Sequence, residues 1–259
     1  MNFKSKLSRI WSKIENLVFV NHACISCRRE ILDGTRFSLC ENCLADINKI
    51  SGNVCKVCGE KILVDNKFCD ACKNTKYSFS QSRSYAVYTD IAKKIVTRFK
   101  YSSKMYYAKH IAEMMAENKE YFENVDYLTF VPIGSKRRKE RGFNQAEEIA
   151  KHLGNTFNIP VLDILEKVGS ERHQAGLTQK ERQENLSGTI ALRTDVDLDI
   201  KNKTIMIVDD VFTTGSTLSE CARIINSDKK NKPAKVLCYT FAKTAYYSTN
   251  NGQNQQNIL

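Results

Sequence analysis

The sequence lacks the features of a membrane-spanning or exported protein. Its 259 residues contain no uninterrupted apolar run of about 18 residues, the length that a transmembrane helix requires. Residues 1–20 carry charges throughout and have no continuous apolar core of signal-peptide length. We therefore expect no transmembrane segment and a cytoplasmic location.

A Walker phosphate loop is also absent, because no Gly-x-x-x-x-Gly-Lys-Ser/Thr occurs in the chain. This absence argues against an ATP-driven motor. Acidic residues are few relative to basic ones: 29 Asp and Glu face 40 Lys and Arg, for a net charge of +11. The excess favours polyanionic partners such as nucleic acid or phosphorylated metabolites. A solvated Lys-rich surface would give the same balance, so charge does not decide function.

Cysteines are abundant and regularly paired. Eight of the ten form four Cys-x-x-Cys pairs, which are Cys24 and Cys27, Cys40 and Cys43, Cys55 and Cys58, Cys69 and Cys72. Each pair supplies half of a tetrahedral zinc shell, so the eight predict two structural Zn²⁺ sites without an open coordination position. A redox role is disfavoured because a thioredoxin-like motif needs one pair beside a βαβ unit. Sequential and interleaved combinations of the pairs both remain open.

Changes in composition and hydrophobic pattern along the chain predict four regions. Residues 1–20 form a basic amphipathic helix that we expect to cover apolar surface of the same protein. Residues 21–78 form a double zinc ribbon, residues 79–245 an α/β domain, and residues 246–259 a disordered tail rich in Asn and Gln. The remaining cysteines, Cys221 and Cys238, are predicted to be buried thiols.

Strands and amphipathic helices alternate in residues 79–245, which predicts a parallel sheet with helices on its faces. Strands are expected at 126–133, 204–208 and 235–241. Asn144 is expected to cap a helix that has Glu147 at the capping-box position and Gly154 at its end. Apolar stripes predict three further helices, and their residues are Ile91, Ile95 and Phe99; Ala108, Ile111, Ala112 and Met115; Leu218, Cys221, Ala222 and Ile225.

The most specific motif spans residues 204–218. An apolar strand leads into two carboxylates, Asp209 and Asp210, and then into a helix through a loop of small hydroxyl residues and one glycine. Backbone amides and the helix dipole can bind a phosphate there, while the carboxylates accept hydrogen bonds from sugar hydroxyls. The segment resembles the signature of type I phosphoribosyltransferases, which bind 5-phosphoribosyl-1-pyrophosphate (PRPP) with Mg²⁺. The resemblance implies that Asp209 and Asp210 contact the ribose, and that the 5′-phosphate is held by Thr213, Thr214, Gly215, Ser216 and Thr217.

A basic segment follows the strand at 126–133. The loop at residues 131–135 includes Pro132, Ile133 and Gly134, and five of the six residues at 136–141 are basic. Ligands of open parallel sheets bind at the carboxyl ends of strands. The loop is thus placed to reach the pyrophosphate of PRPP, with charge from Lys136, Arg137 or Arg141. A solvated basic loop and a nucleic-acid contact that includes Phe143 are the alternatives.

Further motifs are similar to those of the ComF family, which combines a double zinc ribbon with a type I phosphoribosyltransferase domain. They are Arg141–Gln145, Arg98–Tyr101 and Gln174–Asn185, together with the cysteine pairs. The resemblance implies a role in DNA uptake during natural transformation. The family usually has Thr shortly before the position of Gln174, where this chain has residues 171–173 (Glu-Arg-His). We interpret His173 as a surface residue rather than a proton shuttle.

Three functions are compatible with these motifs. The one we favour is a PRPP-binding protein of DNA uptake that also binds single-stranded DNA and depends on an ATP-driven helicase partner. The alternative is an active Mg²⁺-dependent phosphoribosyltransferase, although no segment predicts an acceptor site. A regulator that senses PRPP is the third.

Overall fold

The computed structural model describes residues 23–31, 35–62, 67–101, 104–168, 188–196 and 199–245. The predicted N-terminal helix, the predicted tail and the motif Gln174–Asn185 lie outside the described residues, as does His173. No helix among the described residues is long and apolar enough to span a bilayer.

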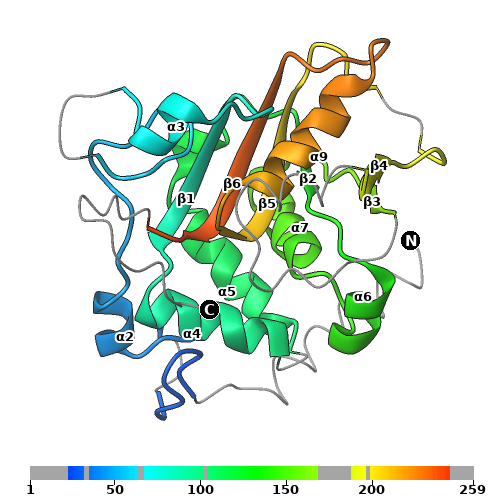
Figure 1. Cartoon of the computed structure of the whole chain (residues 1–259). Helices are drawn as coiled ribbons and strands as arrows, with labels where there is room; N and C mark the ends of the chain where they lie inside the picture. The colour runs from blue at the N-terminus through cyan, green and yellow to red at the C-terminus, as the bar shows by residue number, and fades with distance from the viewer. Residues whose placement is uncertain are drawn as a thin grey trace.

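A parallel sheet of four strands forms the centre of the molecule (Figure 1). Its strands are β1 (Gln81–Val87), β2 (Tyr127–Phe130), β5 (Thr204–Phe212) and β6 (Lys235–Lys243), in the order β1-β6-β5-β2. All three neighbouring pairs are parallel. The α/β fold with a parallel sheet is therefore as predicted, although β5 runs through Asp209 and Asp210 to Phe212 rather than ending at residue 208.

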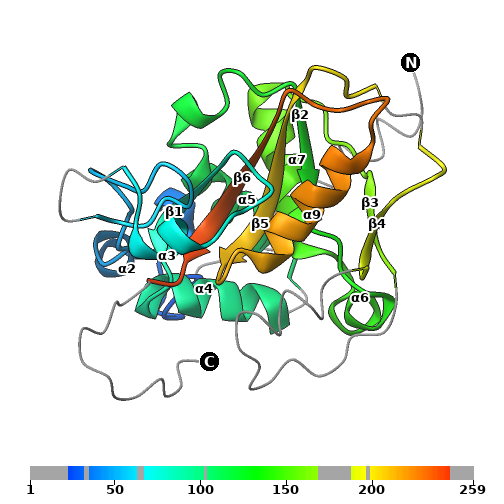
Figure 2. The ribbon, with the colours of Figure 1, turned by 45° about the horizontal axis from the view of Figure 1, so that its top comes forward.

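Helices cover both faces of this sheet, as Figures 1 and 2 show. One face packs against α4 (Asp90–Tyr101), α5 (Tyr106–Met115) and α7 (Gln145–Phe157). The other packs against α9 (Ser216–Ser227) and the hairpin of β3 (Leu165–Lys167) and β4 (Ile190–Leu192). The three predicted apolar stripes are all buried, and Cys221 and Cys238 are buried thiols. A short helix η2 (Lys119–Tyr121) precedes β2.

The two cysteine-rich ribbons repeat one local structure. In the first ribbon (residues 23–45), the Arg28 amide bonds the Cys24 carbonyl; in the second (residues 54–74), the Gly59 amide bonds the Cys55 carbonyl. Arg28 and Gly59 both have positive φ, which turns each knuckle back on itself. In each ribbon the third cysteine precedes a short helix, α2 (Glu41–Ala45) or α3 (Asp70–Asn74). A 3₁₀ turn, η1 (Arg36–Ser38), precedes α2.

The ribbons pack on opposite faces of the sheet. Buried residues of the first ribbon, including Ile25 and Leu39, join the core that contains α4 and α5. Buried cysteines of the second ribbon join the core that contains α9. Each ribbon is too small for a core of its own and completes one core of the larger domain.

Two details of the predicted helices are wrong. The segment after β2 is a loop only to Gly134, and Ser135–Arg141 form a helix, α6, that ends at the left-handed Gly142. The helix that Asn144 caps continues past Gly154 to Phe157 and ends at Asn158, which adopts positive φ. Asn144 does accept a hydrogen bond from the Ala146 amide, as predicted. Gly154 serves close packing instead, because a Cβ there would lie 2.6 Å from Val161 Cγ2 and 2.7 Å from the Ile159 carbonyl oxygen.

We expect Gly154→Ala to destabilise the protein by about 1–3 kcal/mol, because the added methyl group displaces the backbone of Ile159. An alanine inside a helix ordinarily stabilises relative to glycine by up to about 1 kcal/mol, so the sign of the change is diagnostic. Urea unfolding with zinc present measures it, and Asn155→Ala on the exposed side of the same helix is the control. A Gly154→Ala variant as stable as the wild type would show that the contact is loose.

Candidate functional site

Two carboxylates stand at the carboxyl end of β5. Side chains alternate along a strand, so Asp210 faces the side of α4 and α5 and Asp209 faces the side of α9. The Asp209 Oδ1 accepts a hydrogen bond from the Asp210 amide at 2.8 Å. Lys100, near the end of α4, pairs with Asp210 over 3.0 Å between Nζ and Oδ2. The carboxylates, as predicted, lie directly before the loop.

The electrostatics of the pair are asymmetric. Burial and the neighbouring charge of Asp210 raise the pKa of Asp209 to about 7, and Lys100 and Arg141 partly offset that rise. Asp209 as a whole residue is half-buried, and desolvation of its carboxyl group is the largest cause of the raised pKa. Burial lowers the pKa of Lys100, yet the Asp210 partner outweighs it and the net direction is upward. The site therefore holds one firmly paired carboxylate and one that titrates near neutral pH.

The loop after β5 presents backbone amides at a helix start. Gly215 has φ of 76° and provides no side-chain cap for α9, which begins at Ser216. The hydroxyls of Thr214 and Ser216 lie 2.8 Å apart. The Ser216 amide makes only a long hydrogen bond, 3.4 Å, to Thr214 Oγ1. Amides at a helix start together with the helix dipole form an anion-binding feature. The structure thus groups residues 213–217 with Asp209 and Asp210 at one end of the sheet.

The predicted basic segment is brought to the same end only in part. Asn144 Nδ2 donates to the Val131 carbonyl at 2.9 Å, which fixes the loop at Pro132–Gly134. Arg141 donates to Gln145 Oε1 at 3.1 Å, and its charge acts on both Asp209 and Lys100. Lys136 and Arg137 lie earlier on α6 and are exposed. The structure therefore places Arg141 near the carboxylates, with Lys136 and Arg137 on an outward surface.

Sequence reasoning missed two contacts of this site. Lys100 appeared only within the family motif Arg98–Tyr101, without an expected partner. Tyr77, whose hydroxyl donates to the Thr214 carbonyl at 3.0 Å, belongs to no motif of the sequence. A lysine at the end of an apolar helix stripe gives a weak signal, and a tyrosine over a hundred residues from its partner gives none.

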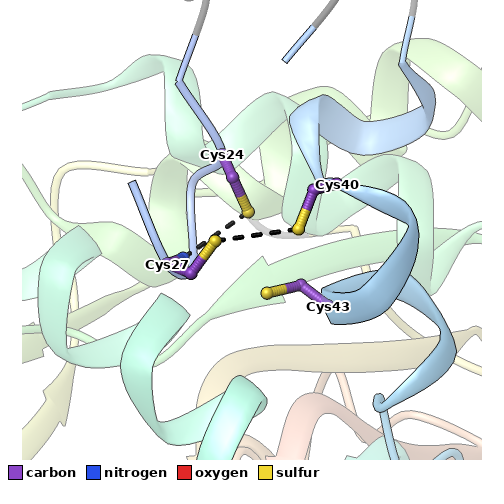
Figure 3. Close-up of side chains that lie close together, drawn as sticks. All are labelled: Cys24, Cys27, Cys40 and Cys43. Carbon is purple, nitrogen blue, oxygen red and sulfur yellow. Dashed lines mark hydrogen bonds between the residues drawn. The ribbon is translucent and has the colours of Figure 1, made fainter. Parts of the chain in front are cut away.

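The eight paired cysteines form two separate clusters. Cys24, Cys27, Cys40 and Cys43 make one, with their sulfurs pointing toward one another (Figure 3), and Cys55, Cys58, Cys69 and Cys72 make the other. The pairing is therefore sequential and not interleaved. Within each cluster all Sγ atoms lie within 4.8 Å of one another, and Cys27–Cys40 and Cys58–Cys69 are 3.7 and 3.6 Å apart.

These separations suit a metal. Four thiolates about 2.3 Å from a tetrahedral zinc ion lie roughly 3.8 Å from one another. Burial raises the pKa of Cys24, but amide groups of Cys27, Cys40 and Ser26 outweigh it and bring the value to about 7. Cys55 has the corresponding arrangement and the same value of about 7, whereas burial raises the pKa of Cys43 and Cys58 to about 12. The donor set and geometry fit two four-cysteine zinc sites.

Comparison with known proteins agrees with this architecture. The double zinc ribbon domain profile matches residues 14–73, and the phosphoribosyl transferase domain profile matches residues 102–251. Competence protein F of Haemophilus influenzae is 26% identical over 80% of this chain and 92% of its own length. Competence protein ComFC of Bacillus subtilis is 27% identical over 80% and 84%. The chain belongs to the ComF family of phosphoribosyl transferase domain proteins.

Other ComF relatives carry a different name. DNA utilization protein YhgH of Salmonella typhimurium is 24% identical over 81% of this chain and 92% of its own length. Among solved structures, an adenine phosphoribosyltransferase is 12% identical with a TM-score of 0.35, covering 58% of this chain and 75% of the other. This degree of similarity is not evidence for a ligand or an activity of this chain.

The raised pKa of Asp209 makes the stability of this ComF protein depend on pH. The folded state holds the Asp209 proton more tightly than the unfolded state does, so ionisation above about pH 7 costs folding free energy. Stability from this group is full below its unfolded pKa near 4 and falls as pH rises through 7. We expect Asp209→Asn to stabilise the protein more at pH 8.5 than at pH 6. The difference in the free energy of unfolding should be at most about 1.4 kcal/mol, because only about one pH unit lies between pH 6 and the pKa of about 7.

Thermal unfolding at both pH values, with zinc present, measures this difference. Asp46→Asn, which removes an exposed carboxylate just after the first ribbon, is the control. An Asp209→Asn gain that is equal at the two pH values would contradict the assignment of a raised pKa.

Proposed function

We propose that this ComF protein binds PRPP at the carboxyl end of β5 and acts in DNA uptake, where it also binds single-stranded DNA. The observation that supports PRPP is the combination of Asp209 and Asp210 with an uncapped helix start at Gly215. Paired carboxylates repel a bare phosphate but accept hydrogen bonds from the two ribose hydroxyls. A phosphorylated sugar satisfies both halves of the site.

The roles of the residues follow from their positions. Amides and hydroxyls of residues 213–217 bind the 5′-phosphate, and Asp209 and Asp210 bind the ribose hydroxyls. Residues 132–134 and Arg141 reach toward the pyrophosphate, whose oxygens are suitable Mg²⁺ ligands. Lys100 orients Asp210 through an ion pair of 3.0 Å.

Calorimetric titration with PRPP and Mg²⁺ tests this site. We expect the wild type to bind and Asp209→Ala/Asp210→Ala to lose binding, because the ribose then has no acceptor. The control is Glu120→Ala/Glu123→Ala, which removes the same charge from exposed positions before β2. Absence of binding to well-folded wild type, or unchanged binding by the double aspartate variant, would contradict the proposal.

The proposed DNA-binding surface is α6 with the adjoining end of α4. Lys136 and Arg137 are exposed on α6, and Phe99 of α4 packs against Phe143 just beyond α6, with ring centroids 5.6 Å apart. Tyr101, at the end of α4, is 77% exposed. Cations that contact the backbone and an aromatic ring on which a base can stack are the usual elements of single-strand binding. The names of the relatives, competence and DNA utilization proteins, agree with this partner.

We expect Lys136→Ala/Arg137→Ala/Arg141→Ala to weaken binding of an oligothymidine and to reduce its salt dependence. The slope of log K against log salt should fall by up to about two units, since each lost phosphate contact accounts for about 0.7 in single strands. Fluorescence anisotropy over a salt series measures both quantities.

The control variant is Lys229→Ala/Lys230→Ala/Lys232→Ala, which removes three cations from the connection before β6, at the opposite end of the sheet. If both triple variants weaken binding equally, the interaction is one of net charge and α6 is not a site. No binding by the wild type at low salt would remove DNA from the proposed function. Force for transport would come from an ATP-driven helicase partner, because the sequence has no Walker loop.

Phosphoribosyl transfer is the alternative function of the same site. Lys100 and Arg141 supply positive charge beside the carboxylates, where a departing pyrophosphate would need it. Release of pyrophosphate from PRPP in the presence of a panel of nucleobases would favour the enzyme over a binding protein.

A further inference from the structure

The segment that follows the second ribbon makes direct contact with the loop after β5. Tyr77 lies five residues beyond Cys72, the last cysteine of that ribbon, and donates its hydroxyl hydrogen to the Thr214 carbonyl at 3.0 Å. Burial raises the pKa of Tyr77, so the hydroxyl stays protonated and remains a donor. The hydrogen bond holds a loop carbonyl on the side that faces the ribbon.

Aromatic rings connect the same elements. The rings of Tyr77 and Phe79 stack at 4.7 Å, and both meet the Phe212 ring edge-on at 6.3 Å. Gly215 fits closely against this group: an added Cβ would lie 2.5 Å from the Phe212 ring and 2.9 Å from the Tyr77 ring. The two rings therefore set the position of the glycine at the start of α9.

A cation links the ribbon to Phe212 a second time. Lys243, only 5% exposed at the end of β6, lies with Nζ 3.9 Å from the centre of the Phe212 ring. The same Nζ is 3.4 Å from Glu60 Oε2 in the second ribbon. Phe212, just before the loop, is thus contacted by the Tyr77 ring from the segment after the ribbon, and by Lys243, which pairs with Glu60 of the ribbon itself.

The segment between Tyr77 and β1 is tied to the helix that follows the loop. The Ser78 amide donates to Ser219 Oγ at 3.0 Å, and Asn226 Nδ2 donates to the Ser78 carbonyl at 2.9 Å. A displacement of this segment would therefore disturb the loop and both ends of α9.

The first ribbon has different neighbours. Its Ser38 hydroxyl lies 3.0 Å from His110 Nε2 of α5, Arg36 pairs with Glu117 just after α5, and the Ile25 carbonyl accepts a hydrogen bond from Arg98 of α4. These contacts lie on the other face of the sheet. The two metal sites, though locally alike, differ in their access to the loop.

We propose that metal binding by the second ribbon, transmitted through Tyr77, holds residues 213–217 in the conformation that binds a sugar phosphate. A four-cysteine ribbon without metal loses most of its structure, because ligand binding supplies its folding free energy. Loss of that metal then frees Tyr77 and lets the loop open, whereas loss of metal from the first ribbon leaves the loop closed. Tyr77 is a positioning residue, and the inference concerns regulation of the site assigned above to PRPP.

Hydrogen exchange of the loop amides tests the coupling without any ligand. Cys69→Ser and Cys40→Ser form a matched pair, since each removes the residue that precedes the short helix of one ribbon. Metal analysis should find about two zinc ions per wild-type chain and about one per variant. We expect amides 213–217 to exchange at least about tenfold faster in Cys69→Ser and at the wild-type rate in Cys40→Ser, while β5 and β6 remain protected in both.

Tyr77→Phe keeps every cysteine and separates the hydrogen bond from ribbon folding. This variant should bind two zinc ions, and its loop amides should exchange faster than in the wild type. Its affinity for PRPP should fall about fivefold, the factor expected of one ordinary hydrogen bond. Tyr127→Phe, at the amino end of β2, is the control. Wild-type exchange rates in Cys69→Ser would overturn the coupling; if that variant is unfolded, wild-type rates in Tyr77→Phe would overturn it. Failure of the wild type to bind PRPP refutes the proposed ligand, while the exchange rates still decide the coupling.

Discussion

The contact between Gly215 and the ring of Phe212 is the constraint on which the candidate site depends. Phe212 ends β5 and Gly215 precedes α9, so this contact sets the turn between strand and helix. A side chain at residue 215 would collide with Phe212 and Tyr77, and its φ of 76° would be strained for any other residue. Phe212 of the sheet and Tyr77 from the segment after the second ribbon both contact this turn, so tertiary packing determines the conformation of the loop.

The pair of carboxylates beside this turn destabilises the folded state. Two adjacent aspartates in a partly buried site repel one another. Among the described residues Asp210 forms an ion pair with Lys100 at 3.0 Å, whereas Lys100 and Arg141 offset the pKa rise of Asp209 only in part. The raised pKa of Asp209 expresses the remaining cost. A purely structural strand end has no use for such a pair, because an Asn or Thr would cap it without repulsion. Costly groups that converge at one end of a sheet are characteristic of a ligand site.

The parts of this molecule that could be predicted from sequence are those with a local cause. The Cys-x-x-Cys spacing, the apolar stripes and the Asn144 cap each depend on neighbours within a few residues, and all three are present. The length of β5 was underestimated because Asp209 and Asp210 interrupt its apolar pattern, while pairing with β6 extends the strand to Phe212. The sequence predicts a helix end at Gly154 because the close approach of Ile159 and Val161, which explains the glycine, has no sequence signal. The contacts of Tyr77 and Lys100 join residues far apart in the sequence and likewise have no local sequence signal.

The edge of the sheet explains why the ribbons cannot be treated as a separate appendage. An exposed edge strand leaves backbone groups unpaired, and here the chain between the ribbons pairs with β1. The Ile50 amide bonds the Tyr85 carbonyl and the Val87 amide bonds the Asn48 carbonyl, at 2.9 and 2.8 Å. Farther along, the Ser82 amide donates to the Val57 carbonyl inside the second ribbon at 2.6 Å. Main-chain hydrogen bonds thus fix the position of the ribbons relative to the sheet. A change in one cysteine cluster is therefore transmitted to the sheet rather than absorbed by a flexible linker.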